Sequence, residues 1–346
     1  MKYQLIPENA LEEKALKFNI AARPLFDPFL PVIQARSLMA GVRLGIFEAF
    51  DQEGRTAECL AQKLSLDSEC LRLLLEVLVC AGYISRDKDV YSLTERSKST
   101  LLQSSPIRLT GWMEYNYIHW RVIDKLEDVI KSGKGIDPNF MLRSPAEWAV
   151  CQQAMLETAR PAARDIAALV PVKEGALKML DIGGSHGLYG AMICRLHPPL
   201  HSEVLELPEA VEHARKLAVQ EGIDDVVKHR SGDALTDDLG DGNDLVFLGN
   251  IIHHFQPDII RQLLIRLKTS MTKGGTVAIW EFKYPDPGSS ADIIGNGLSL
   301  FFRLTSNARC YRADDYIEWL KQAGFGDITI QPTPLAPSNI LITGRI

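Results

Sequence analysis

The chain has 346 residues and a formal net charge of −6, and 46% of its residues are hydrophobic. This length is sufficient for two domains, each with its own core. The negative charge argues against a nucleic-acid partner, and the apolar runs fall far short of the ~20 residues that span a membrane. The six cysteines lack C-x-x-C or metal-ligand spacing, so we expect free thiols, no metal and a cytoplasmic location.

The first third of the chain is predicted to be mainly helical. After a helical arm over residues 1–28, hydrophobic periodicity and turn signals predict helices over residues 31–50, 57–64 and 70–80 and a hairpin over residues 83–93. Thr56 is the predicted N-cap of the second helix, and Asp67 or Ser68 that of the third. Helix, turn, helix and hairpin together outline a winged helix.

A winged helix can also bind DNA, through a basic second helix that lies in the major groove. Here the corresponding helix contains Asp67, Glu69, Arg72 and Glu76, a net charge of 1 − 3 = −2. Leucines and valines cover most of its circumference. The composition therefore favours packing against protein neighbours in a homodimer, and a ligand-responsive transcription regulator remains the alternative that is not an enzyme.

Predicted strands and helices alternate in the second half of the chain. The strands lie near residues 179–182, 203–205, 226–228, 244–248, 276–280, 327–330 and 339–342, and helices near residues 145–168, 188–196, 210–221, 259–269 and 313–324. Such alternation is typical of an α/β fold with a mostly parallel sheet and helices on both faces. Ligands of such folds bind at the carboxyl ends of the strands.

A glycine-rich turn follows the first of these strands, in the order Asp181-x-Gly183-Gly184-Ser185-x-Gly187. Glu206 ends the next strand, 206 − 187 = 19 residues later, where α/β folds place an acid on ribose hydroxyls. Dinucleotide fingerprints carry an apolar residue before their glycines. An acid at that position repels a pyrophosphate but suits the ammonium and sulfonium of S-adenosylmethionine. A nicotinamide dehydrogenase and an ordinary tight strand-to-helix turn are the alternatives.

Six motifs taken together resemble the dimeric class I small-molecule O-methyltransferases, such as the plant caffeate and isoflavone enzymes, the hydroxyindole enzyme and bacterial secondary-metabolite enzymes. The motifs are Leu44-Gly45-Ile46-Phe47, Leu180-Asp181-Ile182-Gly183-Gly184, Glu206-Leu207-Pro208, Gly232-Asp233, Ile252-His253-His254-Phe255 and Gln322-Ala323-Gly324-Phe325. The resemblance runs from about residue 30 to the C-terminus. It implies a Rossmann-like, seven-stranded methyltransferase domain that ends in an antiparallel hairpin and follows a mainly helical winged-helix dimerisation domain.

The resemblance also implies boundaries and cofactor contacts. We expect a dimerisation domain over residues 1–105, connecting helices over residues 106–170 and the S-adenosylmethionine-binding domain over residues 171–346. Glu206 would bind the ribose hydroxyls and Asp233 the adenine amino group, with S-adenosylhomocysteine as the product. The full predicted cofactor set is Asp181, Gly183, Gly184, Gly187, Glu206, Leu207, Asp233 and Ala234.

Methylation of a phenolic hydroxyl requires a base, because phenols titrate near pH ~10 and keep their proton at pH 7. Imidazole titrates near ~6.5, so a neutral histidine is the expected base. His253 and His254 follow the fourth predicted strand. The resemblance assigns the base to His253 and places His254 at a variable position. We expect the adjacent side chain to face elsewhere, and neighbouring histidines of a helix are poorly placed to share a metal. The alternative is that both histidines are surface or packing residues.

Two positions depart from the family pattern. Where many members carry an acid that orients the base, this chain offers Asn296 or Ser299, neither of which is anionic. Gly249 replaces a lysine that plant members often place near the adenine. The first departure raises the alternatives of a C-methyltransferase or a relative that no longer transfers methyl groups.

Residues 112–120 concentrate bulky aromatic and apolar groups in one helical stretch. This stretch is either a core helix or the wall of an acceptor pocket, and the two interpretations are compatible. Because family members line their acceptor site from this region, we expect a small aromatic or enolic metabolite as substrate. The predicted pocket residues are Trp112, Tyr117, Met155, Asn296 and Phe302.

Overall fold

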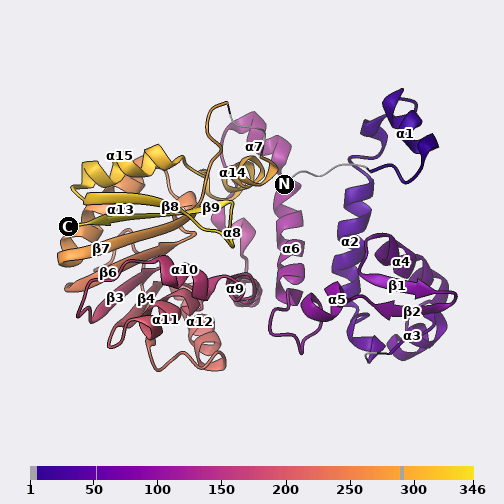
Figure 1. The fold of residues 1–346 in the computed structure, drawn as a ribbon, viewed down its shortest axis with the longest axis horizontal. Coiled ribbons are helices and arrows are strands. Elements are labelled where there is room, and N and C mark those ends of the chain that lie inside the picture. The colour runs from indigo at the N-terminus through magenta and orange to yellow at the C-terminus, as the bar shows by residue number, and fades with distance from the viewer. Residues whose placement is uncertain (1–5, 52, 289–291) are drawn as a thin grey trace. The chain divides into compact units, whose positions relative to one another are not determined.

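The structure is a computed structural model that describes residues 6–51, 53–288 and 292–346. The chain divides into two compact units, residues 2–117 and residues 118–346 (Figure 1). No helix of the described residues is long and apolar enough to cross a membrane.

The N-terminal unit contains a winged-helix arrangement of short elements. In order these are α1 (Ala10–Lys17), α2 (Leu30–Arg43), α3 (Ala57–Leu64), α4 (Ser68–Cys80), β1 (Ile84–Asp87), β2 (Val90–Leu93) and α5 (Glu95–Thr100), with 3-10 turns at Arg23–Leu25 and Glu48–Phe50. The Thr56 hydroxyl accepts a hydrogen bond from Cys59 N at 3.3 Å, and Asp67 Oδ1 accepts one from Cys70 N at 2.8 Å. These are the caps that start α3 and α4, as predicted.

One hydrophobic core holds this unit together. Strands β1 and β2 pair antiparallel, and β1 packs against α4, which in turn contacts α3. The core residues come from the 3-10 turn, both helices and the hairpin, and include Ile46, Phe47, Phe50, Leu60, Leu75, Leu78, Ile84 and Tyr91. By contrast, α1 buries none of its residues within the chain.

Helix α6 (Thr110–Ile123) leads into the C-terminal unit, which is built on one sheet. Its helices are α7 (Leu126–Ser132), α8 (Pro138–Met141), α9 (Pro145–Ala159), α10 (Ala163–Leu169), α11 (Leu188–Leu196), α12 (Pro208–Gln220), α13 (Pro257–Ser270), α14 (Ile293–Ser306) and α15 (Ala313–Ala323). Its strands are β3 (Lys178–Ile182), β4 (His201–Glu206), β5 (Val227–Ser231), β6 (Asn243–Gly249), β7 (Met271–Phe282), β8 (Gly326–Pro332) and β9 (Asn339–Arg345).

The sheet has seven strands in the order β5-β4-β3-β6-β7-β9-β8. The first five in this order run parallel, and β9 is antiparallel to both β7 and β8. The Rossmann-like, seven-stranded prediction and the final antiparallel hairpin are therefore confirmed. The strand order reverses beside β3, so the turn after β3 lies at the switch point where α/β folds bind ligands.

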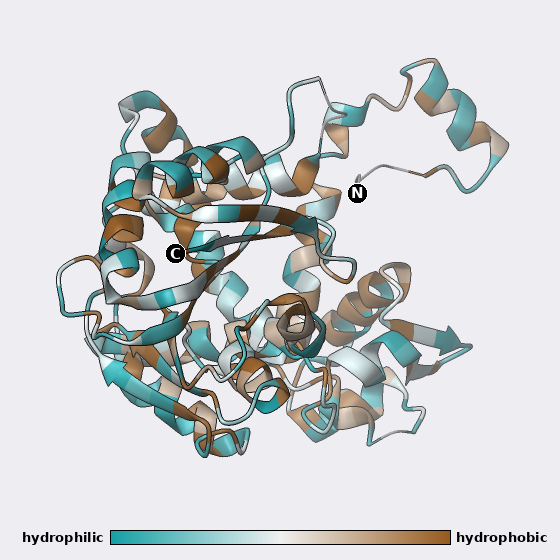
Figure 2. Ribbon diagram, turned by 60° about the vertical axis from the view of Figure 1, so that its left-hand side comes forward, coloured by the Kyte–Doolittle hydropathy of each residue, from teal (hydrophilic) through white to brown (hydrophobic). Residues whose placement is uncertain are grey.

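Alternate residues of the central strands pack on opposite faces of the sheet. Leu180, Val246 and Ile279 belong to the core that contains residues of α13 and α15. Met179 and Phe247 belong to the core shared with α10 and α11. Figure 1 shows these helix pairs on the two sides of the sheet, and brown, hydrophobic segments run along the strands in Figure 2.

The predicted helix near residues 145–168 is wrong as a single element. It divides into α9 and α10, which are separated by residues 160–162. Pro161 lies in this break. A proline inside a helix removes a backbone donor and clashes with the preceding turn, which explains the division.

Candidate functional site

The turn after β3 requires glycine at three positions. Gly183 and Gly187 have φ angles of +61° and +75°, which L residues with side chains rarely adopt. A Cβ atom on Gly187 would lie 2.7 Å from Val227, and one on Gly184 would lie 2.3 Å from the carboxylate of Asp181. Glycine is therefore required here because the turn packs closely against the side chains of Val227 and Asp181.

Asp181 lies directly beneath the turn and is 1% exposed. Neither carboxylate oxygen has a hydrogen-bond partner within the described part of the chain. Burial raises the pKa of Asp181 to about 8, and the charge of Glu206 contributes to the rise. A buried acid without a partner is costly, and a nearby cationic ligand would offset that cost.

Glu206 holds the same turn from the end of β4. Its Oε2 accepts a hydrogen bond from Ser185 N at 2.9 Å, and Oε1 accepts one from Leu207 N at 2.8 Å. Burial raises the pKa of this carboxyl, while the two backbone donors oppose the rise. The acid therefore orders the glycine-rich turn in addition to any contact with a ligand.

Asp233 and Ala234 follow β5, the neighbouring strand of the sheet. Asp233 Oδ1 accepts a hydrogen bond from Leu235 N at 2.8 Å, which fixes a tight turn. The structure thus brings the predicted cofactor residues to the carboxyl ends of three adjacent strands, β3, β4 and β5. This is the edge at which α/β folds bind their ligands.

Two histidines that the sequence analysis did not single out also hold the turn. Leu188 N donates to His186 Nδ1 at 3.0 Å, and His229 Nε2 lies 2.8 Å from the Ser185 carbonyl oxygen. Burial lowers the pKa of His186 to about 3, with a further decrease from His229, against a bond to the Met155 backbone that raises it. A neutral His186 therefore connects the turn with α9, which carries the predicted pocket residue Met155.

His253 lies on a 3-10 helix (Ile252–His254) just after β6 and is 3% exposed. Its Nδ1 is 2.9 Å from Oε2 of Glu281, near the end of β7. Its ring stacks on Phe302 of α14, with ring centroids 3.7 Å apart and planes inclined by 17°. The imidazole is therefore held at one edge by an acid and on one face by an aromatic ring.

The expectation that His253 lacks an acid partner is wrong, because Glu281 provides one. Glu281 is fully buried, and its Oε2 also accepts from Phe282 N at 3.2 Å. Because this oxygen already accepts a backbone N–H, the arrangement favours His253 Nδ1 as the donor and a lone pair on Nε2. Burial lowers the pKa of His253 to about 3 and raises that of Glu281 well above its usual value. The imidazole is therefore neutral at pH 7.

Asn296 and Ser299, which the sequence analysis considered at the position of this acid, form hydrogen bonds within the α14 segment. The Ser299 hydroxyl donates to the Gly295 carbonyl at 2.8 Å. Asn296 is exposed, and its Nδ2 donates to the Asp292 carbonyl at 2.8 Å. Glu281 could have been suspected from the sequence only as an acid at the end of the apolar run 276–280.

The sequence analysis expected the His254 side chain to face away from His253. The structure shows instead that the two rings lie side by side. The two ring centroids are 4.4 Å apart, and the His254 ring makes an edge contact with Phe302 at 5.4 Å. His254 Nδ1 is 2.5 Å from the hydroxyl oxygen of Ser306 at the end of α14. A 3-10 turn with Phe302 in contact with both rings keeps the adjacent imidazoles together.

The predicted pocket residues divide between the two units. Phe302 contacts the histidines, and its neighbour Phe301 makes an edge contact with His119 of α6 at 4.7 Å. Trp112 and Tyr117 belong to the N-terminal unit. There the Tyr117 ring lies under the guanidinium groups of two arginines of α2, Arg36 and Arg43. The assignment of Trp112 and Tyr117 to an acceptor pocket therefore stays a prediction.

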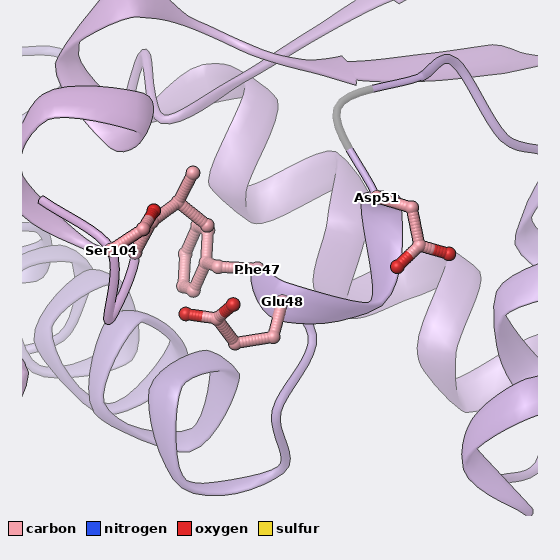
Figure 3. A pocket seen from close by; sticks show the side chains of 5 residues that line it. Phe47, Glu48, Asp51 and Ser104 are labelled. Atoms are coloured by element: carbon pink, nitrogen blue, oxygen red, sulfur yellow. The ribbon is translucent and has the colours of Figure 1, made fainter.

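A cavity of about 190 Å³ lies in the N-terminal unit, lined by Phe47, Glu48, Asp51, Leu102 and Ser104 (Figure 3). Its two acids already have partners, since Glu48 accepts from Gln103 N at 2.6 Å and Asp51 pairs with Lys63. No group of three or more metal-ligating side chains occurs among the residues that the structure describes. This cavity is therefore a weaker candidate than the sheet edge.

Comparisons with known proteins agree with this geometry. Residues 120–326 match the model of the O-methyltransferase domain, and residues 32–104 match that of the O-methyltransferase dimerisation domain. The 3-hydroxy-5-methyl-1-naphthoate 3-O-methyltransferase of Streptomyces sahachiroi is 24% identical over 85% of this chain and 87% of that enzyme. The N,N-dimethyltransferase OxyT of Streptomyces rimosus is 24% identical over 86% of this chain and 92% of that protein.

Solved structures show the same fold. Human N-acetylserotonin methyltransferase in complex with SAM superposes with a TM-score of 0.83 at 20% identity, over 99% of each chain. The chain thus belongs to the O-methyltransferase family and is a methyltransferase whose cofactor is S-adenosyl-L-methionine.

Proposed function

We propose that this enzyme methylates a hydroxyl group of a small aromatic or enolic metabolite and that His253 is the general base. The observation that carries this proposal is the bond from His253 Nδ1 to Glu281 Oε2 at 2.9 Å. That bond leaves Nε2 as the basic atom of a buried, neutral imidazole. The position beside the carboxyl edge of the sheet supports a role in chemistry rather than in packing alone.

The residues at the ends of β3, β4 and β5 fit S-adenosylmethionine. Asp181 is a buried acid whose oxygens have no hydrogen-bond partner among the described residues, and the turn above it carries glycine where a side chain would not fit. Glu206 and Asp233 would hold the ribose and the adenine, and Gly183, Gly184, Gly187, Leu207 and Ala234 would line the approach. The bound cofactor supplies an electrophilic methyl group that is displaced in line from a sulfonium.

The chain itself contributes positioning and proton removal. Holding the acceptor hydroxyl in line is worth roughly 7–11 kcal/mol of the barrier. His253 Nε2 takes the hydroxyl proton, typically a 10²–10⁴-fold contribution. Glu281 Oε2, beside Nδ1, accepts the Nδ1 proton and so holds the ring in the tautomer that presents Nε2. Phe302 keeps the ring in place by stacking.

Transfer to carbon or nitrogen is the alternative, and one relative is named as an N,N-dimethyltransferase. A neutral amine attacks through its own lone pair and needs no base before transfer. The acid-imidazole pair next to the sheet edge supports oxygen as the acceptor atom, because a hydroxyl gains most from a placed base.

Calorimetric titration with S-adenosylhomocysteine and with NADH tests the cofactor assignment. We expect binding of the former and none of the latter, and the reverse would overturn the proposal. Transfer of label from S-adenosyl-[methyl-³H]methionine to a panel of mono- and dihydroxynaphthalenes then tests the reaction, because the S. sahachiroi relative is named for a hydroxynaphthoate. Label that enters carbon or nitrogen would contradict O-methylation, and the acceptor that takes up most label serves as the probe acceptor below.

The functional form is proposed to be a cytoplasmic homodimer. The dimerisation-domain match covers α2, where Val32 and Ile33 are 42% and 39% exposed, and Phe29 just before it is 60% exposed. Apolar groups in such a row are typical of an interface, and we expect more than ~2,000 Å² of it, as in obligate dimers. Light scattering at micromolar concentration should give twice the chain mass, whereas a monomer would contradict the proposal.

A further inference from the structure

We propose that Asn307, just after α14, is a positioning residue for the transfer reaction, because it joins the α7–α8 segment (residues 133–137) to the 3-10 turn that carries His253 and His254. This inference rests on the proposed O-methyl transfer and adds a residue that acts through the two imidazoles without touching the reactants. The contacts that carry it lie around the last turns of α14.

The end of α14 holds both histidine rings. Phe302 stacks on His253 with ring centroids 3.7 Å apart, and the hydroxyl oxygen of Ser306 is 2.5 Å from His254 Nδ1. A displacement of this helix end would therefore move the stacking ring and the hydroxyl group together. The position of the two imidazoles thus depends on what fixes the end of α14.

The α7–α8 segment packs tightly against that helix end. Ile136 N donates to the Leu304 carbonyl at 2.7 Å, one of the four final carbonyls that a helix leaves without an internal partner. A Cβ atom on Gly135 would lie 3.0 Å from two carbonyl oxygens of the helix end and from Asn307 N. The two backbones are therefore in direct contact, and a side chain at Gly135 would displace one of them.

Asn307 connects this contact with the segment that follows the histidines. Its Oδ1 accepts from Gly135 N at 3.3 Å, and its carbonyl oxygen accepts from Nε2 of Gln256, two residues after His254. Its φ angle is +59°, in the left-handed region that asparagine tolerates better than most residues with side chains. One residue thus touches both the α7–α8 segment and the chain that leaves the histidine turn.

Apolar packing makes the connection stiff. Ile136 and Phe301 pack against Leu304, which is 2% exposed, in a cluster with Val122 of α6 and Val129 of α7. Because close-packed interiors transmit strain, a shift of the segment would reach the helix end. A misplacement of about 1 Å that originates far from the chemistry can cost about 10²-fold in rate. The α7–α8 segment should therefore affect turnover although it holds none of the proposed site residues.

Two glycine substitutions in the full-length enzyme test this inference. Gly135→Ala places a methyl group against the helix end, whereas Gly297→Ala adds one to α14 where no described atom lies within 4 Å. Gly135→Ala should lower kcat for the probe acceptor by about 10-fold or more, with little change in KM for S-adenosylmethionine. Gly297→Ala should keep the wild-type kcat. Unchanged affinity for S-adenosylhomocysteine in both variants shows that the fold is intact.

The histidine signals distinguish positioning from a general loss of stability. Spectra of ¹⁵N-histidine-labelled enzyme loaded with S-adenosylhomocysteine report the rings without any acceptor. In Gly135→Ala the Nδ1 signal of His254 should shift because its hydroxyl partner moves, and the His253 signals should shift because the stacked ring moves. Both should stay in place in Gly297→Ala. His201, an exposed residue of β4, should not change in either variant.

Further variants test Asn307 through its two contacts. Asn307→Gly keeps the left-handed backbone but removes the acceptor of Gly135 N, and Gln256→Ala removes the other contact. Each should lower kcat by about 2- to 10-fold, the usual worth of one hydrogen bond. The double variant should lose no more than the more damaging single variant, because both interrupt one connection. Asn307→Asp keeps an acceptor oxygen and should restore most of the rate.

The outcomes separate this inference from the proposed function. Wild-type turnover and unshifted histidine signals in Gly135→Ala would overturn it, as would independent, multiplying losses in the double variant. If Gly135→Ala does not fold, the Asn307 and Gln256 variants decide by the same measurements. A parallel loss of cofactor affinity and kcat in Asn307→Gly would show a purely structural role and also overturn it. Absence of methyl transfer by the wild type would instead contradict the proposed function, and the histidine signals would still decide the inference.

Discussion

Two buried acids at the same edge of the sheet have opposite surroundings. Asp181, under the glycine turn after β3, has no hydrogen-bond partner for either oxygen among the described residues. Glu281, at the end of β7, has the His253 imidazole at 2.9 Å and the Phe282 N–H at 3.2 Å. Burial raises the pKa of both carboxyl groups.

The contrast separates a site prepared for binding from one prepared for proton transfer. An acid left without a partner is stabilised when a cationic ligand arrives, whereas an acid bonded to an imidazole fixes that ring before any ligand is present. Substitutions near β3 and β4 should therefore change cofactor affinity, and substitutions near β7 should change turnover.

His253→Ala should have the largest effect. Transfer to the probe acceptor should fall by about 10²–10⁴-fold, the usual contribution of a placed base. Affinity for S-adenosylhomocysteine should stay unchanged, and part of the lost rate should return at high pH, where the acceptor ionises unaided. His201→Ala, an exposed histidine at the far end of β4, is the control. A wild-type rate in His253→Ala would contradict the assignment of proton transfer to the residues near β7.

Glu206→Ala should weaken cofactor binding by about 2–3 kcal/mol, because two hydrogen bonds of a charged group are lost. That corresponds to roughly 30- to 150-fold in the dissociation constant of S-adenosylhomocysteine. Calorimetry measures the change, and Glu206→Gln, which keeps one acceptor oxygen, should lose less. Wild-type affinity in Glu206→Ala would remove Glu206 from the cofactor site.

Glu281→Gln should lower turnover by about 10- to 100-fold, since an amide can donate its own N–H to Nδ1 and so permits the wrong tautomer. Cofactor affinity should not change. Single-turnover rates with the probe acceptor measure the effect. Equal losses in cofactor affinity and turnover would show that Glu281 supports the whole edge rather than the base.

Asp181→Asn should have an effect of a different kind, visible as a pH dependence of stability. Because the pKa of folded Asp181 is raised to about 8, its stabilising contribution is present at low pH and is lost as pH rises toward 8. The variant should therefore gain on the wild type between pH 5 and 8, by at most ~1.4 kcal/mol per pH unit. Urea unfolding at several pH values measures this gain, and a constant difference would contradict it.

Much of this fold is local and could be predicted from sequence. Caps at Thr56 and Asp67 and the helix α11 after Gly187 depend on residues a few positions apart, and the structure has them as expected. The prediction of a single helix near residues 145–168 is wrong because Pro161 interrupts it. This signal is also local, since proline breaks a helix at its own position.

The partners of the histidines could not be predicted, because they come from distant elements. Glu281 lies 28 residues from His253, and Ser306 lies 52 residues from His254. Periodicity indicates which face of a strand is buried but not which side chain on a neighbouring strand or helix will meet it. The family pattern places the acid near Asn296 and Ser299 on α14, whereas the structure has it on β7, at Glu281.

The proton position on His253 tests the central claim most directly, without knowledge of the acceptor. Long-range ¹H–¹⁵N correlation spectra of histidine-labelled enzyme at pH 7, assigned by loss of signals in His253→Ala, report it. We expect a neutral ring with the proton on Nδ1 and a bare Nε2. A ring protonated on Nε2, or a fully charged imidazolium, would contradict the assignment of His253 as the base.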